Sequence, residues 1–131
     1  MSVLHRLIYA SEAVGQTGAT ILSVAQILGA SERNNRRDHV TGCLMFHRGH
    51  ILQVLEGARP DLDRLMRRIV EDGRHRNVRV LIDQPIPARR MTDPMCLCGD
   101  PETLIERAGL TCLSRITAVE AETMLDLRKA A

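Results

Sequence analysis

Three polar residues occupy positions that the sequence pattern places in the interior: Tyr9, Asn35 and Gln53. Gln53 interrupts the apolar run I-L-Q-V-L-E-G, and in a strand it would share a face with Ile51 and Leu55. A buried amide without hydrogen-bond partners costs about 1–3 kcal/mol. Glutamine offers an acceptor and two donor hydrogens, so it suits a ligand whose edge presents both kinds of group. These residues therefore suggest recognition of a small molecule with a polar edge.

Two of these residues also have an ordinary structural explanation. Gln53 can bond a backbone group at a sheet edge, and Tyr9 can be a core ring with a hydrated hydroxyl. Tyr9 is nevertheless unusual, because the chain has one tyrosine, one phenylalanine and no tryptophan. Any chemistry that needs a phenol must therefore use Tyr9.

Cysteine chemistry has weaker support in the sequence. The chain has four cysteines, Cys43, Cys96, Cys98 and Cys112. A single C-x-C pattern without a second pair is not a typical zinc site, so we expect no metal and free thiols. Cys43 lies in an apolar run where a thiol is inert, which argues against a thiol enzyme that pairs it with His39 or His47.

Length and composition indicate one globular domain rather than a disordered or membrane protein. The 131 residues are 44% hydrophobic and 26% charged, with a net charge of +2. That surplus is too small to indicate nucleic acid binding, and the arginine clusters at 33–37 and 64–79 are typical of solvated helix ends or of one anionic ligand. No apolar run approaches the ~20 residues of a membrane span, and no signal sequence is evident, so we expect a cytoplasmic protein.

The apolar patterns predict the order strand, helix, strand, strand, helix, strand. The predicted strands are 4–9, 40–46, 51–55 and 78–83, and the predicted helices are 18–31 and the segment from Pro60 to a cap at Gly73. The run N-N-R-R-D at 34–38 should end the first helix, Gly49 should form a hairpin turn, and P-I-P at 85–87 should end the fourth strand. This order predicts an α+β sandwich with two helices on one face of a mainly antiparallel sheet.

The second helix has the strongest periodic signal, and the C-terminal region a weaker one. The apolar positions of that helix are Leu62, Leu65, Met66, Ile69 and Val70. A short fifth strand is expected near 91–98, followed by helices at 102–107 and 116–127. Ile116, Val119, Met124 and Leu127 are interpreted as core cover rather than a partner surface. We expect a domain of residues 1–98 and a helical extension of residues 99–131.

Five short motifs in order resemble the BLUF domain, a blue-light sensor that binds flavin. They are L-I-Y-A-S (7–11), N-x5-T-G (35–42), L-Q-V-L-E-G (52–57), R-I-x2-D-x-R-H (68–75) and D-x-P-I-x2-R (83–89). Each motif alone is weak, but five at suitable intervals across residues 1–95 form a specific pattern. The resemblance implies a ferredoxin-like sandwich with flavin, either FAD or FMN, held between two helices.

The resemblance also implies roles for individual residues. Tyr9 matches the tyrosine that gives an electron to the excited flavin, and Gln53 matches the glutamine between that tyrosine and the ring. Asn35 matches the asparagine at the flavin carbonyl edge. Further implied flavin contacts are Asn34 at the ring or ribityl, Arg68 and Asp72 at the pyrimidine edge, Arg74 and His75 near the ribityl-phosphate end, and Ile27 and Ile69 on the ring faces.

A switching mechanism follows from the resemblance. Light drives an electron and a proton from Tyr9 to the flavin. The resulting radical pair recombines, and the Gln53 amide is left rearranged by rotation or tautomerisation. In the family the signal passes to a fifth strand. Here Pro94 stands at the family's tryptophan position and Cys96 at its methionine position, with Met95 adjacent. The chain is then interpreted as a short stand-alone sensor, not an enzyme, that signals to a separate partner protein.

Two other readings remain open. A flavin-free protein of the same fold would act as an interaction adaptor. A hydrolase of the acylphosphatase type, built on arginine and asparagine, would need a phosphate loop, and no matching loop is present. The C-terminal helices either pack on the sheet of their own chain or mediate self-association.

Overall fold

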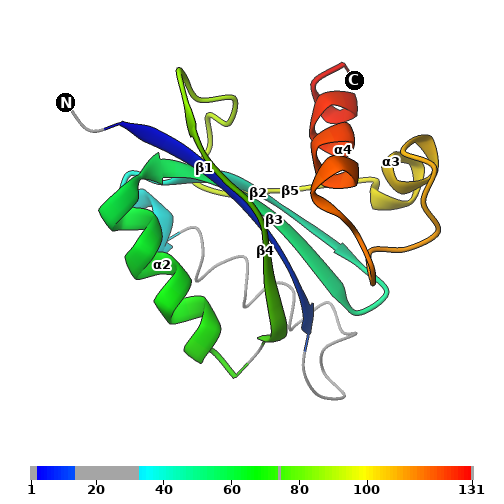
Figure 1. Cartoon of the computed structure of the whole chain (residues 1–131), viewed down its shortest axis with the longest axis horizontal. Coiled ribbons are helices and arrows are strands. Elements are labelled where there is room, and N and C mark those ends of the chain that lie inside the picture. Colours follow the sequence, from blue (N-terminus) through cyan, green and yellow to red (C-terminus); the bar gives the residue numbers. More distant parts are fainter. Residues whose placement is uncertain (1–2, 14–32, 74, 131) are drawn as a thin grey trace.

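A five-stranded sheet forms the centre of the computed structural model, which describes residues 3–13, 33–73 and 75–130 (Figure 1). The strands are β1 (Leu4–Ala13), β2 (Thr41–His47), β3 (His50–Ala58), β4 (His75–Ile86) and β5 (Cys96–Leu97). Their order is β4-β1-β3-β2-β5, with antiparallel neighbours throughout except for β2 and β5, which are parallel. The order of the first four strands confirms the predicted ferredoxin-like sheet. The predicted first helix, 18–31, lies outside the described residues.

The two faces of the sheet carry separate hydrophobic cores, because side chains alternate along each strand. Helix α2 (Arg59–Glu71) covers one face, where Leu62, Leu65 and Ile69 pack with Leu7 and Leu55. Helices α3 (Pro101–Arg107) and α4 (Ala118–Ala130) lie on the opposite side of the sheet (Figure 1). The C-terminal helices therefore pack on the sheet of their own chain, one of the two alternatives that the sequence left open.

Helix α2 matches its predicted pattern except at its end. Pro60 occupies the first turn, where its missing N–H costs nothing. Val70 is 64% exposed, so the buried stripe ends at Ile69. The cap is Asp72, whose backbone N–H bonds the Ile69 carbonyl at 3.1 Å. Gly73 has no left-handed φ, so the prediction that it caps the helix was wrong.

The prediction that N-N-R-R-D breaks a helix was wrong for its first four residues. Residues 33–37 are helical, and the turn comes at Asp38 and His39. His39 has φ +57°, and the Val40 N–H bonds the Asn35 carbonyl at 2.9 Å, which is the left-handed cap that usually contains glycine. The prediction failed because a histidine takes that glycine role here.

The hairpin between β2 and β3 is as predicted, with Arg48 at φ +50° and Gly49 at φ +81°. Strand β4 is longer than the predicted 78–83 and includes Pro85. A proline is tolerated because β4 is an edge strand, and one side of it has no ladder to interrupt. The short fifth strand lies within the predicted window, at Cys96–Leu97.

Both C-terminal helices have side-chain caps. The Asp100 side chain accepts from the Thr103 N–H at 3.2 Å, and Thr117 and Glu120 form a reciprocal capping box before α4. Ile116 and Met124 are buried as predicted, whereas Val119 is 73% exposed. No helix in the described part of the chain is long and apolar enough to cross a membrane.

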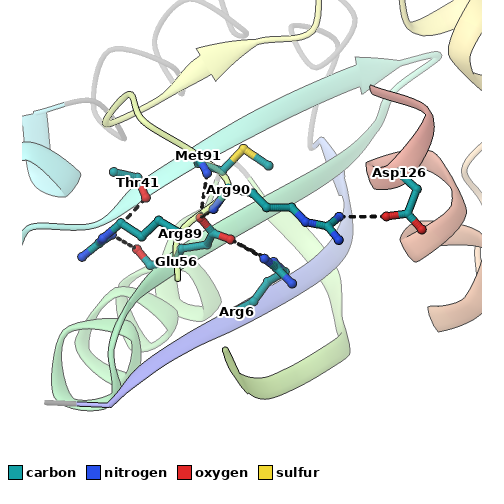
Figure 2. A network of polar contacts seen from close by, with 7 residues as sticks. All are labelled: Arg6, Thr41, Glu56, Arg89, Arg90, Met91 and Asp126. Atoms are coloured by element: carbon teal, nitrogen blue, oxygen red, sulfur yellow. Dashed lines mark hydrogen bonds and ion pairs between the residues drawn. The ribbon is translucent and has the colours of Figure 1, made fainter. Parts of the chain in front are cut away.

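A buried carboxylate fixes the segment that leads into β5 (Figure 2). Glu56 is fully buried and pairs with Arg6, its cross-strand partner, at 2.7 Å. Its other oxygen accepts from the backbone N–H groups of Arg90 and Met91, each at 2.8 Å. Arg89 adds a bond to the Glu56 backbone carbonyl at 2.7 Å. The segment after β4 is thus tied to the middle of the sheet.

We expect Glu56→Gln to lower the free energy of unfolding by about 3 kcal/mol, because Arg6 would keep a buried charge without its partner. Equilibrium urea unfolding followed by circular dichroism measures the change. Glu122→Gln, at an exposed position of α4, is the matched control and should shift stability by less than about 0.5 kcal/mol. Equal effects of the two substitutions would contradict this role of Glu56.

Candidate functional site

Tyr9 and Gln53 lie opposite each other on neighbouring strands. They are direct partners in the β1–β3 ladder, and both are buried on the face that α2 covers. Directly opposed side chains on one face lie within contact distance, so the register alone brings them together. The Tyr9 hydroxyl donates a hydrogen bond to Gln53 Oε1.

The other end of the Gln53 amide points to the segment before β5. Its Nε2 donates to the Met95 sulfur at 3.6 Å. Met95 is buried in the α2-side core, whereas Cys96 packs against the core on the opposite face. Of the two residues expected near the family's methionine position, Met95 is therefore the one that meets Gln53.

The surroundings of Tyr9 keep its phenol neutral. Burial, and then the negative charge of Asp72, raise the pKa of Tyr9 above its ordinary value. The His75 ring lies edge-on to Tyr9, with 6.1 Å between ring centres, and its Nδ1 is 3.0 Å from Ser11 Oγ. Ser11 belongs to the motif L-I-Y-A-S, although no feature of that motif identifies it as a site residue.

Asn35 has one satisfied and one unsatisfied end. Its Nδ2 donates to the Pro94 carbonyl at 2.7 Å, which ties the helical residues 33–37 to the segment that holds Met95. Its Oδ1 is buried and has no hydrogen-bond partner among the described residues. A buried carbonyl oxygen without a donor is costly, so such an atom in a native protein calls for an explanation.

Arg68 shows the same feature. Its guanidinium bonds Asp38 at 3.1 Å, and hydrogen bonds from Arg37 and then from Arg68 lower the pKa of Asp38. The Arg68 Nε is buried without a partner in the described structure. Asp38 was not expected in the site, although it ends the run N-N-R-R-D that contains Asn35.

The remaining predicted site residues are distributed as follows. Ile69 is buried in the same core as Tyr9, Asn34 is half-buried on the helical residues 33–37, and His75 is buried at the start of β4. Ile27 and Arg74 lie outside the described residues. The structure therefore brings together Tyr9, Gln53, Met95 and Ile69, while Asn35 and Arg68 bring buried, unsatisfied polar atoms from the segments beside them.

Comparison with known proteins places this site in a family. Residues 4–95 match the family model described as "BLUF: Sensors of blue-light using FAD". The chain belongs to the BLUF family. The structure also superposes on the dark state structure of the BLUF protein BlrB with a TM-score of 0.75 and 27% identity, covering 96% of this chain and 98% of that one.

BLUF relatives include much larger proteins. The chain is 32% identical over 88 residues to the blue light- and temperature-regulated antirepressor BluF of Escherichia coli, covering 67% of this chain and 21% of that protein. It is 32% identical over 90 residues to the photoactivated adenylate cyclase subunit beta of Euglena longa, covering 69% of this chain and 10% of that subunit. The chain thus spans about a fifth and a tenth of the length of these relatives.

The single tyrosine allows its titration to be followed directly. Because burial and Asp72 raise the pKa of Tyr9, we expect no phenolate absorbance while the protein is folded. The unfolded phenol titrates at about pH 10, so protonated Tyr9 stabilises the fold fully below that pH and the contribution is lost as the pH rises towards the folded pKa. Ultraviolet absorbance and circular dichroism across alkaline pH measure both events.

Tyr9→Phe is the control for this titration, because it lacks the ionising group and should lose less stability at alkaline pH. Phenolate absorbance at about pH 10 in a protein that circular dichroism shows to be folded would contradict the burial of Tyr9.

Proposed function

We propose that this BLUF protein holds a flavin on the α2 side of the sheet and reports blue light through the Gln53 amide. The observation that carries the proposal is Gln53 itself, which links the sole phenol of the chain to the segment before β5. The buried, unsatisfied Asn35 Oδ1 and Arg68 Nε fit a ligand with a polar rim. Ile69 supplies an apolar surface for a flat ring.

FAD is the flavin that we propose, in line with the description of the family, with FMN as the alternative. Heat release of the bound flavin followed by chromatography against both standards decides between them. Asn34, Asp72 and His75, together with Ile27 and Arg74, complete the proposed flavin contacts.

The chain's own residues then perform the switch. Bound flavin supplies absorption of blue light and an excited state that is a strong one-electron oxidant. Tyr9 loses an electron, and its proton moves along the existing hydrogen bond to Gln53 Oε1. When Tyr9 regains both, Gln53 remains rotated or tautomerised, so the donor that faced Met95 is replaced. The response uses light and converts no substrate, so the protein acts as a sensor rather than an enzyme.

The output leaves through β5 and the helices that follow it. Met95 touches Gln53, and the two-residue β5 is held to the sheet by only a short parallel ladder with β2. Few backbone bonds make such a segment easy to displace. We propose that residues 1–98 form the sensor, that 99–131 form an extension, and that a separate partner protein reads their arrangement.

Gln53→Leu should keep the bound flavin and its yellow colour but lose the light-induced red shift, because leucine cannot exchange donor and acceptor. A light-minus-dark visible spectrum of the purified protein measures this. Tyr9→Phe should also remove the shift, since the chain has no other tyrosine and no tryptophan.

Gln84→Leu, at an exposed position of β4, is the matched control and should retain the full shift. A red shift that survives in Gln53→Leu would refute the proposed switch. Wild-type protein that stays colourless after incubation with FAD and FMN would instead favour the flavin-free adaptor.

Asn35→Ala should weaken flavin binding about tenfold, which corresponds to the loss of one hydrogen bond worth about 1.4 kcal/mol. Quenching of flavin fluorescence on titration with apoprotein measures the affinity. Asn77→Gly, which keeps a positive φ at an exposed site on β4, is the control. Unchanged affinity in Asn35→Ala would show that Asn35 Oδ1 does not face the ligand.

A further inference from the structure

Three cysteines and an arginine gather on the face of the sheet opposite to Gln53. Cys43 on β2 and Cys96 on β5 are direct partners in the parallel ladder. Cys98 and Arg128 lie beside them, and the Arg128 guanidinium donates to Cys96 Sγ at 3.2 Å. All four cysteines of the chain are free. Nothing in the proposed light response uses these groups.

The charges around Cys96 favour its ionised form. A hydrogen bond from the Cys43 thiol, and then the positive charge of Arg128, outweigh burial and the Asp93 carboxylate and lower the pKa of Cys96 to about 6. The same hydrogen bond and its own burial raise the pKa of Cys43, and Cys98 acts in the same direction. The Cys43 hydrogen bond and the Arg128 cation therefore favour the thiolate of Cys96, with a protonated thiol beside it.

We propose that Cys96 is a redox-reactive thiolate that hydroperoxides oxidise, with Cys43 as its resolving thiol. A metal site is the obvious alternative for clustered cysteines. However, no three His, Cys, Asp or Glu residues in the described part of the chain are grouped to hold a metal ion. A low-pKa, partly accessible thiolate next to a second thiol is instead the arrangement of a redox-sensitive pair.

The chemistry balances with a hydroperoxide as the oxidant. The Cys96 thiolate attacks one peroxide oxygen, so an S–O bond forms, the O–O bond breaks and the leaving oxygen takes a proton. Sulfur is oxidised by two electrons and the peroxide is reduced by two. Cys43 then attacks the sulfenic sulfur, so an S–S bond forms and the S–O bond breaks. The proton of Cys43 leaves with the hydroxide as water.

The solvent access of Cys96 and the geometry of the strand pair are consistent with both steps. Cys96 is half-buried rather than enclosed. The cavity of about 30 Å³ beside the pair is lined by Cys43, Cys98 and Arg128 but not by Cys96, so a hydroperoxide reaches Cys96 from its solvent-exposed side. Paired residues on adjacent strands also have Cα atoms within the range that a disulfide needs.

Oxidation of Cys96 would affect the site around Gln53 through the neighbouring residue, Met95. Cys96 follows Met95, whose sulfur meets Gln53 on the other face. A covalent bond from Cys96 to Cys43 would fix β5 to β2, and thereby restrain the Met95 segment. This consequence, unlike the oxidation itself, rests on the proposed light response.

The first test is the reactivity of each cysteine in the intact, flavin-containing protein kept in the dark. Limited iodoacetamide labelling, followed by peptide mass spectrometry, should show a Cys96 rate with a midpoint near pH 6. In Arg128→Gln that midpoint should rise by about one unit, because the cation that favours the thiolate is gone. Arg128→Lys should restore much of the shift, and Arg115→Gln, a surface control, should have no effect.

Dilute hydrogen peroxide should then give a Cys43–Cys96 disulfide in the wild type and a dimedone-trapped sulfenic acid on Cys96 in Cys43→Ala. A Cys96 midpoint at the ordinary thiol value, or oxidation that falls on Cys112 first, would overturn the proposal. A Cys96–Cys98 bond in place of Cys43–Cys96 would overturn the assignment of the resolving thiol.

The coupling to light is tested separately by the dark recovery of the red shift. The rate of dark recovery of oxidised wild type should differ at least about twofold from that of the reduced protein. The rate of Cys96→Ser should be the same under oxidising and reducing conditions. Equal recovery rates with a proven disulfide would refute the coupling alone. Absence of a light-induced red shift in the reduced wild type would refute the proposed light response but would not affect the proposed thiol chemistry.

Discussion

One buried amide determines how the rest of this protein is arranged. Gln53 lies on the central strand of the sheet, fully enclosed, and its two ends need a donor and an acceptor. Tyr9 provides the donor from β1 and Met95 the acceptor from the segment before β5. A sulfur is a weak acceptor, so one end of the amide is held much less firmly than the other. An amide that is satisfied unequally at its two ends is suited to exchange them.

The alternation of side chains across the sheet separates two kinds of chemistry by one residue. Met95 faces the amide, and Cys96 faces a thiol and an arginine. Both residues belong to a segment with a very short ladder, yet its start is anchored by the buried Glu56 and by the Asn35 bond to Pro94. A segment that is anchored at its start and weakly held beyond that point can have two positions that differ little in energy, which is what a switch requires.

Much of the fold and part of the site could be predicted from local pattern. The period-two burial of Ile51, Gln53 and Leu55 and the α2 stripe were visible because each depends only on residues near in sequence. The motif N-N-R-R-D was misread because a histidine, not a glycine, takes the left-handed cap. The roles of Asp38 and Glu56 were missed because their partners, Arg68 and Arg6, are far away in sequence. The opposite directions of Met95 and Cys96 depend on the register of a two-residue strand, which no sequence pattern sets.

The most direct test of the Gln53 switch is an infrared light-minus-dark difference spectrum of flavin-loaded protein. In this protein Gln16, Gln26 and Gln84 are replaced, so that Gln53 is the only glutamine, and its side chain is labelled with ¹⁵N. If Gln53 reorients, illumination changes an infrared band that the label shifts, while the visible spectrum moves to the red. A visible red shift with no label-sensitive infrared change would contradict the switch, because the amide would then keep one orientation in the dark and in the light.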